Sequence, residues 1–216
     1  MKKIITILTP LFFLVTVVAK AEVGVGVTGA LHSIDASGTE TTRTSLEKNT
    51  GSHTEEVLVP EIFVEAIADN GFTLGISYIP TREMGSKSRT DAESPSDPDG
   101  DDGTYTAKAE LDNVIQAYAA IPLGSYPVYV KVGVQHVTLV TLESLNSGST
   151  YPDADLMGFT YGLGHRGELP YGNNLYYKVE ATYTDFDSYT HTNSVGNKLE
   201  AELDDTAVKF SLGYKF

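Results

Sequence analysis

The residues of this 216-residue chain that could carry out chemistry are its histidines, hydroxyl side chains and acidic runs. His136-Val137-Thr138 sets an imidazole two residues from a hydroxyl, so on a strand both side chains would project from one face. Hydrolysis needs a nucleophile, a base in contact with it and an acid that orients the base. Glu143 lies nearby in the sequence but belongs to no recognisable signature. We therefore predict that the protein is not an enzyme.

The other four histidines support the same prediction. His32 precedes Ser33 directly, and adjacent strand residues point to opposite faces. His53 and His191 lie in or near expected loops, and His165 lies near the end of an expected strand. None of the histidines has the spacing of a metal-binding motif, and we predict no cofactor.

An acidic run places Asp97, Asp99 and Asp101 at alternate positions and superficially resembles a calcium-binding loop. The EF-hand pattern fails, because Asp102 stands where glycine is needed and Lys108 where glutamate is needed. We predict a solvated acidic loop and no metal site. Weak Ca²⁺ or Mg²⁺ association at these three aspartates is the alternative.

Composition excludes several classes of protein. The chain has 15 basic and 29 acidic residues, with a net charge of −14. Such a charge argues against nucleic acid, whose phosphates need Lys or Arg, and against a basic patch on anionic lipid. There is no cysteine, hence no disulfide framework and no thiolate metal site. Twenty glycines and thirteen tyrosines without tryptophan favour a β-protein with aromatic belts.

The N-terminus has the pattern of an export signal. Lys2 and Lys3 precede the apolar stretch Ile4–Val18, and Ala19-Lys20-Ala21 is a small-x-small cleavage site. The apolar stretch is shorter than the ~20 residues of a spanning helix. We predict a signal peptide over residues 1–21 and a single mature domain over residues 22–216.

The mature chain is dominated by alternating strands, and the last is the clearest. Between Ala207 and Phe216 one parity is apolar and the other is small or cationic. The apolar parity consists of Val208, Phe210, Leu212, Tyr214 and Phe216.

The same alternation predicts eight strands, at 22–34, 56–68, 72–80, 105–123, 128–135, 157–166, 175–184 and 207–216. In the fourth, we expect Leu111 to share an outward face with Ile115 and Ala117. Short turns at 69–71, 124–127 and 170–173 alternate with long polar loops at 35–54, 81–104, 145–154 and 188–198. We predict an all-β, eight-stranded antiparallel up-and-down transmembrane β-barrel.

The signal, the eight strands and the terminal aromatic together resemble the small OmpA/OmpX-type outer-membrane barrels. The resemblance implies an integral protein of the bacterial outer membrane, monomeric and surrounded by lipid and lipopolysaccharide. It implies that Phe216 and its alternating apolar partners are the signal read by the outer-membrane assembly machinery. The chain departs from the longer OmpA relatives, because it is expected to end with the barrel, without a peptidoglycan-binding domain and its cell-wall-tethering role. His136-x-Thr138 faintly resembles the His-x-Ser of lipid A deacylases, with threonine replacing the nucleophilic serine.

Strand parity places several charges inside the barrel, at Glu61, Glu65, Lys131, Arg166, Lys178, Glu180 and Lys209, and by a less regular alternation Lys108, Glu110 and Asp112. An eight-stranded interior is only wide enough for side chains. We therefore expect these charges to pair in a hydrogen-bonded plug. A gated, narrow ion path is the alternative, because such networks can exchange partners.

The leading functional hypothesis is a non-enzymatic barrel that serves membrane integrity or surface interaction through acidic extracellular loops. The first alternative is a narrow passive pore for ions or small solutes. A lipid A-modifying hydrolase is the second.

Overall fold

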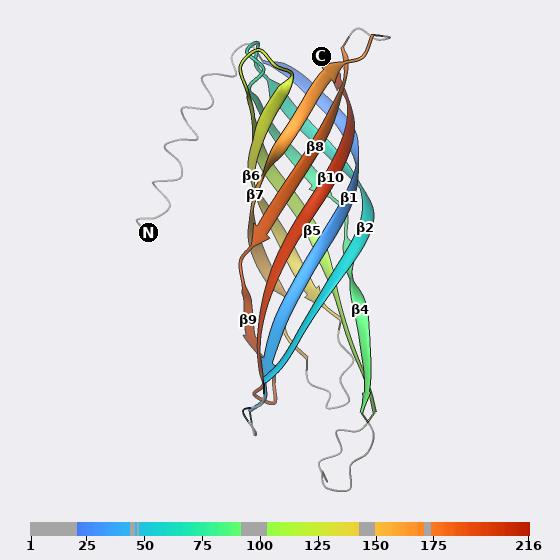
Figure 1. The fold of residues 1–216 in the computed structure, drawn as a ribbon, viewed down its shortest axis with the longest axis vertical. Coiled ribbons are helices and arrows are strands. Elements are labelled where there is room, and N and C mark those ends of the chain that lie inside the picture. Colours follow the sequence, from blue (N-terminus) through green and yellow to red (C-terminus); the bar gives the residue numbers. More distant parts are fainter. Residues whose placement is uncertain (1–20, 44–45, 47, 92–102, 143–149, 171–173) are drawn as a thin grey trace, which may run out of the picture.

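The computed structural model describes residues 21–43, 46, 48–91, 103–142, 150–170 and 174–216, and these form a single antiparallel sheet that closes on itself (Figure 1). Its strands are β1 (Glu22–Thr41), β2 (Lys48–Ile67), β3 (Thr73–Ile79), β4 (Arg82–Asp91), β5 (Gly103–Pro122), β6 (Val128–Thr141), β7 (Ala154–Glu168), β8 (Leu175–Phe186), β9 (Tyr189–Thr192) and β10 (Lys198–Lys215). The described part contains no helix long and apolar enough to cross a membrane.

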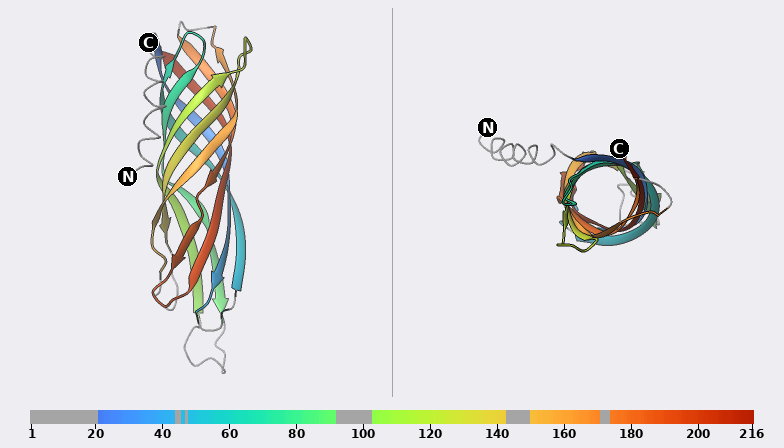
Figure 2. Two further views of the ribbon diagram at one scale, coloured as in Figure 1. Left: turned by 90° about the vertical axis from the view of Figure 1, so that its left-hand side faces the viewer. Right: turned by 90° about the horizontal axis from the view of Figure 1, so that it is seen from above.

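The ten strands make a barrel with eight positions around its wall. β3 and β4 pair in succession with β5, and β8 and β9 pair in succession with β10. β1 pairs with β2 on one side and with β10 on the other, which closes the ring. Viewed along its axis, the ring is nearly round (Figure 2). The predicted fold class is confirmed.

The two ends of the barrel differ as the predicted loop lengths require. At the periplasmic end, β2 and β3 are joined by Asp69-Asn70-Gly71, where Gly71 has a φ of 84°. Phe72 donates a backbone hydrogen bond to the Asn70 side chain at 3.0 Å, which fixes this tight turn. The start of β1 and the end of β10 lie side by side at this end, and the C-terminus is at the top of Figure 1.

The strands continue outward beyond their predicted ends. Residues 35–41, 48–54, 82–91 and 189–192 were expected in loops but are strand. In this outer extension the outward face meets water, so the apolar–polar alternation that marks a lipid-facing strand is missing. Polar cross-strand pairs hold it instead, such as the hydroxyls of Thr39 and Thr50 at 3.2 Å.

A β-bulge reverses the parity of β5. The register of β5 on β6 shifts between Asp112 and Ile115, and Asn113 has a φ of 52°. As a result Leu111 points into the barrel and is fully buried, whereas Ile115 faces outward and is 51% exposed. The prediction that Leu111 shares the outward face of Ile115 is wrong, because one extra residue inverts every position beyond it.

One stretch of the wall lacks backbone pairing. The ladder of β2 onto β3 ends at Ile62 and Tyr78, and beyond it β4 pairs with β5 alone. In the outer half, β2 and β4 therefore run beside each other without a shared ladder in the described residues. We call this the β2–β4 boundary. In Figure 1, β4 descends at the lower right, whereas β2 continues to the lower left beside β1.

Candidate functional site

The outer wall carries an apolar belt. Val208, Phe210, Leu212 and Tyr214 on β10 face outward and are 41–58% exposed, while the alternate residues of β10 are mostly buried in the lumen. Equivalent outward residues on other strands include Val25, Val27, Leu31, Ile62, Val64, Ile76, Phe159 and Leu163. Apolar side chains on every side of a polar interior require lipid around the barrel.

The five residues assigned to the assembly signal all lie on this outer wall. The Phe216 amide donates to the Val23 carbonyl at 2.9 Å, and its ring packs edge-on to Tyr214 with centroids 5.0 Å apart. They therefore lie where the last strand closes onto the first. That the assembly machinery reads them stays a prediction.

Inside the membrane part, Glu65 is the centre of one buried cluster. Its carboxylate accepts hydrogen bonds from the ammonium of Lys178 at 2.7 Å and the phenols of Tyr118 at 2.6 Å and Tyr176 at 2.8 Å. The Lys178 ammonium also lies 3.6 Å from the ring centroid of Phe63. The cluster therefore joins β2, β5 and β8 across the lumen at this level.

Glu180 forms a second pair beside it. It accepts from Lys131 at 3.1 Å and from the Tyr129 hydroxyl at 2.8 Å. The Lys131 ammonium lies 4.2 Å from the ring centroid of Tyr118. The Tyr118 ring therefore contacts both carboxylate clusters.

A third cluster lies further outward. Glu61 accepts from Lys209 at 2.7 Å and lies 3.2 Å from Nε2 of His32. Nδ1 of the same imidazole lies 2.8 Å from Asp205, which also accepts from Arg82 at 2.8 Å. The sequence analysis assigned Glu61 and Lys209 to the lumen but not the other three residues. His32 lies on the inward parity of β1, whereas Arg82 fell in an expected loop.

A polar row on the inner wall joins neighbouring strands. Ser77 lies opposite Gln116, and Gln116 lies opposite Gln135. The Gln116 amide donates to Thr160 at 3.0 Å, and Thr160 contacts Thr184 at 2.8 Å. Within the described part, the buried atoms Ser77 Oγ, Gln116 Oε1, Gln135 Nε2 and Arg82 Nε and Nη1 have no hydrogen-bond partner.

Arg166 differs from the other six predicted lumen charges. It lies at the periplasmic mouth, where it donates to the Thr73 hydroxyl at 2.8 Å and the Gly71 carbonyl at 3.0 Å. The remaining six predicted lumen residues are all buried and ion-paired.

The less regular part of the parity assignment fails. Lys108 pairs with Glu83 and Glu110, both at 3.2 Å, and all three are partly exposed. Lys108 donates hydrogen bonds to the Glu83 and Glu110 carboxylates, and these bonds, that to Glu83 first, raise the pKa of Lys108. Asp112 accepts from Thr81 on the exposed face. The bulge in β5 explains why Glu110 and Asp112 face away from the lumen.

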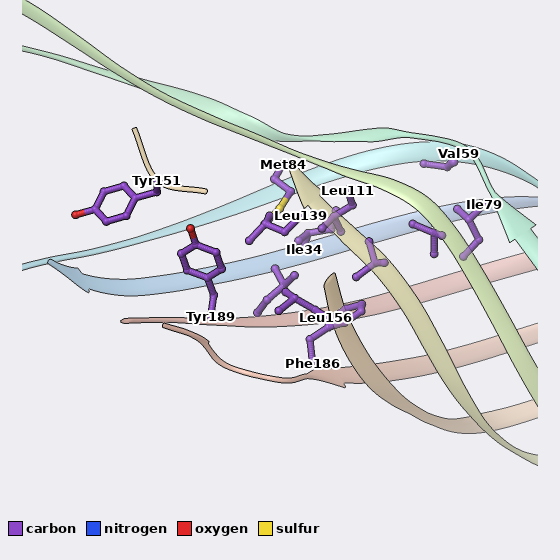
Figure 3. Packing of buried hydrophobic residues seen from close by; sticks show 13 residues of the cluster. Ile34, Val59, Ile79, Met84, Leu111, Leu139, Tyr151, Leu156, Phe186 and Tyr189 are labelled. Carbon is purple, nitrogen blue, oxygen red and sulfur yellow. The ribbon is translucent and has the colours of Figure 1, made fainter. Parts of the chain in front are cut away.

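The outer half of the lumen is apolar, which the sequence analysis did not predict. Its cluster comprises Ile34, Val59, Ile79, Met84, Leu111, Val114, Val137, Leu139, Tyr151, Leu156, Phe186, Tyr189 and Leu203. Figure 3 shows Met84, Leu139, Leu111 and Ile34 packed together, with Tyr151 and Tyr189 set apart from them. Several of these residues were placed in loops, so their inward parity could not be recognised.

At His136 and Thr138, the described residues are not arranged as the hydrolase hypothesis requires, and Glu143 lies outside the described residues. The Thr138 hydroxyl donates to Asp155 at 2.9 Å, and His136 lies 3.8 Å from the same carboxylate. The acid thus stands between the hydroxyl and the imidazole, whereas catalysis requires the hydroxyl to contact the base. Both His136 and Asp155 are exposed on the outer face.

The candidate cation ligands Asp97, Asp99 and Asp101 lie outside the described residues. Among the residues that are described, no group of three or more His, Asp or Glu side chains could hold a metal ion. Weak binding of divalent cations by the acidic run therefore stays an alternative that is based on the sequence alone.

Neither a protein-family model nor a curated protein matches this chain by sequence. Among solved structures, the outer membrane protein OprG from Pseudomonas aeruginosa is similar, with 14% identity, 91% of this chain and 97% of that chain covered, and a TM-score of 0.52. Weaker likenesses include the outer membrane protease OmpT from Escherichia coli (8% identity, 90% and 97% covered, TM-score 0.49). Another is the attachment invasion locus protein Ail of Yersinia pestis (14% identity, 88% and 99% covered, TM-score 0.37).

The closed ring, its apolar belt and the likeness to OprG define the fold class as the small eight-stranded outer-membrane β-barrel. A barrel of this class is integral to the bacterial outer membrane, in agreement with the location predicted from the sequence. The signal peptide and the domain boundaries stay predictions.

Proposed function

We propose that this barrel is a non-enzymatic surface protein whose membrane part is a closed anchor and whose outer extension presents the interacting surface. The observation that carries the proposal is the occupied lumen of the membrane part. Three ion-paired clusters occupy the lumen level with the belt, and an apolar cluster lines the lumen beyond them. Eight strands leave no additional room for a wide channel.

The extension supports a role at the surface. β1 and β2 remain paired as far as Thr41 and Lys48, well beyond Leu31, the last strongly exposed apolar residue of β1. Rigid strands thus hold the extracellular connections away from the lipid, which favours contact with a partner over burial in lipopolysaccharide. The acidic composition of the second long loop favours a basic or cation-bridged partner.

Planar-bilayer recording tests the closed anchor. Purified wild-type protein should give no sustained openings at moderate voltage. A steady, ion-selective conductance would instead support a narrow passive pore. One observation favours that second function. Ser77, Gln116 and Gln135 have polar atoms without a partner in the described part, and these atoms could bind water molecules along a path through the lumen.

A shortened variant tests the role of the surface. Replacing residues 39–50 by a two-residue Asn-Gly turn removes the tip of the β1–β2 hairpin and keeps the paired Gly38 and Gly51. In a strain lacking the protein, wild type and variant should restore detergent resistance equally, while only wild type restores attachment to host cells or matrix. Equal attachment would contradict the proposal.

A further inference from the structure

We propose that the outer half of the barrel contains a binding site for a small uncharged apolar molecule, reached sideways through the β2–β4 boundary. This goes beyond the surface role proposed above and is independent of the extracellular partner. The site is a cavity of about 290 Å³ whose lining residues come from seven strands, among them β2 and β4 on the two sides of the β2–β4 boundary.

Most of the lining of the cavity is apolar. The apolar side chains are those of Met84, Leu139, Tyr189, Leu199, Ala36, Ala109 and Ala201. Three alanines on facing strands leave space that larger side chains would fill. A dry cavity of about 150 Å³ lined by aliphatic side chains already binds benzene, so this volume suits a molecule of about two rings. The favourable term is burial of ligand surface at roughly 25 cal/mol per Å².

The polar groups at the rim determine which ligand charge the cavity accepts. The two basic side chains there are Lys108 and His53, and each is already held by carboxylates. Lys108 bridges Glu83 and Glu110, and His53 lies 3.2 Å from Glu55. An anionic head group would therefore meet an excess of negative charge without a free cation to bind it. The rim thus selects uncharged ligands over acids.

The β2–β4 boundary supplies the entrance. Gly51, Ser52 and His53 of β2 face Met84, Gly85 and Ser86 of β4 at the cavity. Gly85 has a φ of 97°, and a Cβ on it would lie 2.4 Å from Nε2 of His53. The His53 side chain therefore spans the β2–β4 boundary and packs against the backbone of Gly85. Because no ladder joins β2 to β4 here, a rotation of one imidazole can open the wall without breaking backbone hydrogen bonds.

Two dyes of one skeleton test the site. In lipid nanodiscs, uncharged phenylnaphthylamine should bind wild type with saturable fluorescence, and its sulfonated analogue anilinonaphthalene sulfonate should bind at least tenfold more weakly. Ala201→Phe and Ala109→Phe fill the cavity from opposite walls and should each abolish the saturable signal. Thr190→Phe adds the same ring at an exposed position on β9 and should leave it unchanged.

The outcomes are distinct. Equal signals from wild type and both filled variants, when each migrates as a folded barrel on an unboiled gel, would overturn the site. Equal affinity for both dyes would overturn its selectivity for uncharged ligands. Failure of attachment in the hairpin experiment leaves this site untouched, so the two proposals can fail separately.

A crosslink tests the entrance, which the cysteine-free chain makes simple. Joining Ser52→Cys to Ser86→Cys with a short bismaleimide should slow dye association several-fold. The same crosslink between Thr39→Cys and Thr50→Cys, which face each other in a paired hairpin, should not. Unchanged association across the joined boundary would show that ligands enter from the end of the barrel and would overturn the sideways route.

Discussion

Gly75 and Tyr118 lie directly opposite each other on β3 and β5, and the tyrosine ring occupies the space that a Cβ on Gly75 would take, 2.3 Å from that position. The same relation joins Gly164 to Tyr129 and Gly213 to Tyr176. Each of these tyrosines donates to Glu65 or Glu180. Bare glycine backbone thus lets three rings lie flat on the wall, with their hydroxyls aimed at the central carboxylates.

The first prediction concerns this packing. Gly75→Ala should displace Tyr118, break its hydrogen bond to Glu65 and cost about 1–3 kcal/mol through overpacking. Gly29→Ala is the matched control, because nothing lies within 4 Å of the added Cβ. The measurement is the urea midpoint of the folded band on unboiled gels. Equal midpoints for the two variants would show that the Gly75 contact is dispensable.

A second prediction concerns the buried pair of Lys178 and Glu65. Lys178→Met leaves a carboxylate buried without its cation and should cost about 3–5 kcal/mol. Glu65→Gln added to Lys178→Met removes the unpaired charge and should recover a large part of that loss. Circular dichroism during urea unfolding in lipid vesicles measures both. A double variant as unstable as the single one would mean that the cost arises from packing.

The third prediction concerns Asp205, which joins His32 to Arg82. Asp205→Asn leaves the guanidinium without its carboxylate in a fully buried position and should destabilise the barrel by about 3–5 kcal/mol. Asp204→Asn is the matched control, because the Asp204 carboxylate accepts a hydrogen bond from Tyr183 on the partly exposed face. Its loss should cost about 1 kcal/mol. The same unfolding assay compares them, and a smaller loss for Asp205→Asn than for Asp204→Asn would refute the assignment.

A fourth prediction separates assembly from stability at the last residue. Phe216→Ala should lower the amount of folded protein in the outer membrane several-fold, while the purified variant should refold in detergent like wild type. Val208→Ala, on the same outward parity of β10, should change neither quantity greatly. Poor refolding of Phe216→Ala in detergent would assign the residue a structural role instead of one in recognition.

The fifth prediction is that lipid A is not a substrate. Mass spectra of lipid A should be the same with the protein, without it and with His136→Ala, because the Thr138 hydroxyl contacts Asp155 and not the imidazole. A mass change that requires His136 would establish the hydrolase hypothesis.

The sequence sufficed for the barrel because lipid imposes a strict alternation on the strands that it surrounds. Phe210 and Lys209, for instance, could be assigned to opposite faces from parity alone. Pairing within the lumen followed from its charges. Beyond Leu31 the outer wall meets water, so lipid no longer imposes an apolar–polar alternation. Without that alternation, the sequence cannot distinguish a strand from a loop. The bulge at Asn113 left no signal strong enough to reverse the parity of Leu111.

The cavity and the β2–β4 boundary could not be predicted from the sequence, for a related reason. Both depend on which strands fail to pair, and failure to pair is a property of register rather than of composition. The proximity of Met84 and Ala109 could not be predicted, because it depends on β4 continuing β3 along β5. His32 differs, because its parity in β1 already predicts an inward side chain. Its partner on β10, Asp205, could have been inferred from the register of β10 on β1 that closes the ring.

The pairing of β10 with β1 has a consequence for biogenesis. Thr28 and Ser211, which share a hydrogen bond of 2.7 Å, are separated by 183 positions along the polypeptide. Contacts of such separation form slowly, because nearly the whole molecule must be ordered before the two ends can meet. Until then both edges stay open to stray β-augmentation. We therefore expect the exported chain to require an escort through the periplasm that shields its first and last strands, and delayed delivery should produce aggregates in preference to partial barrels.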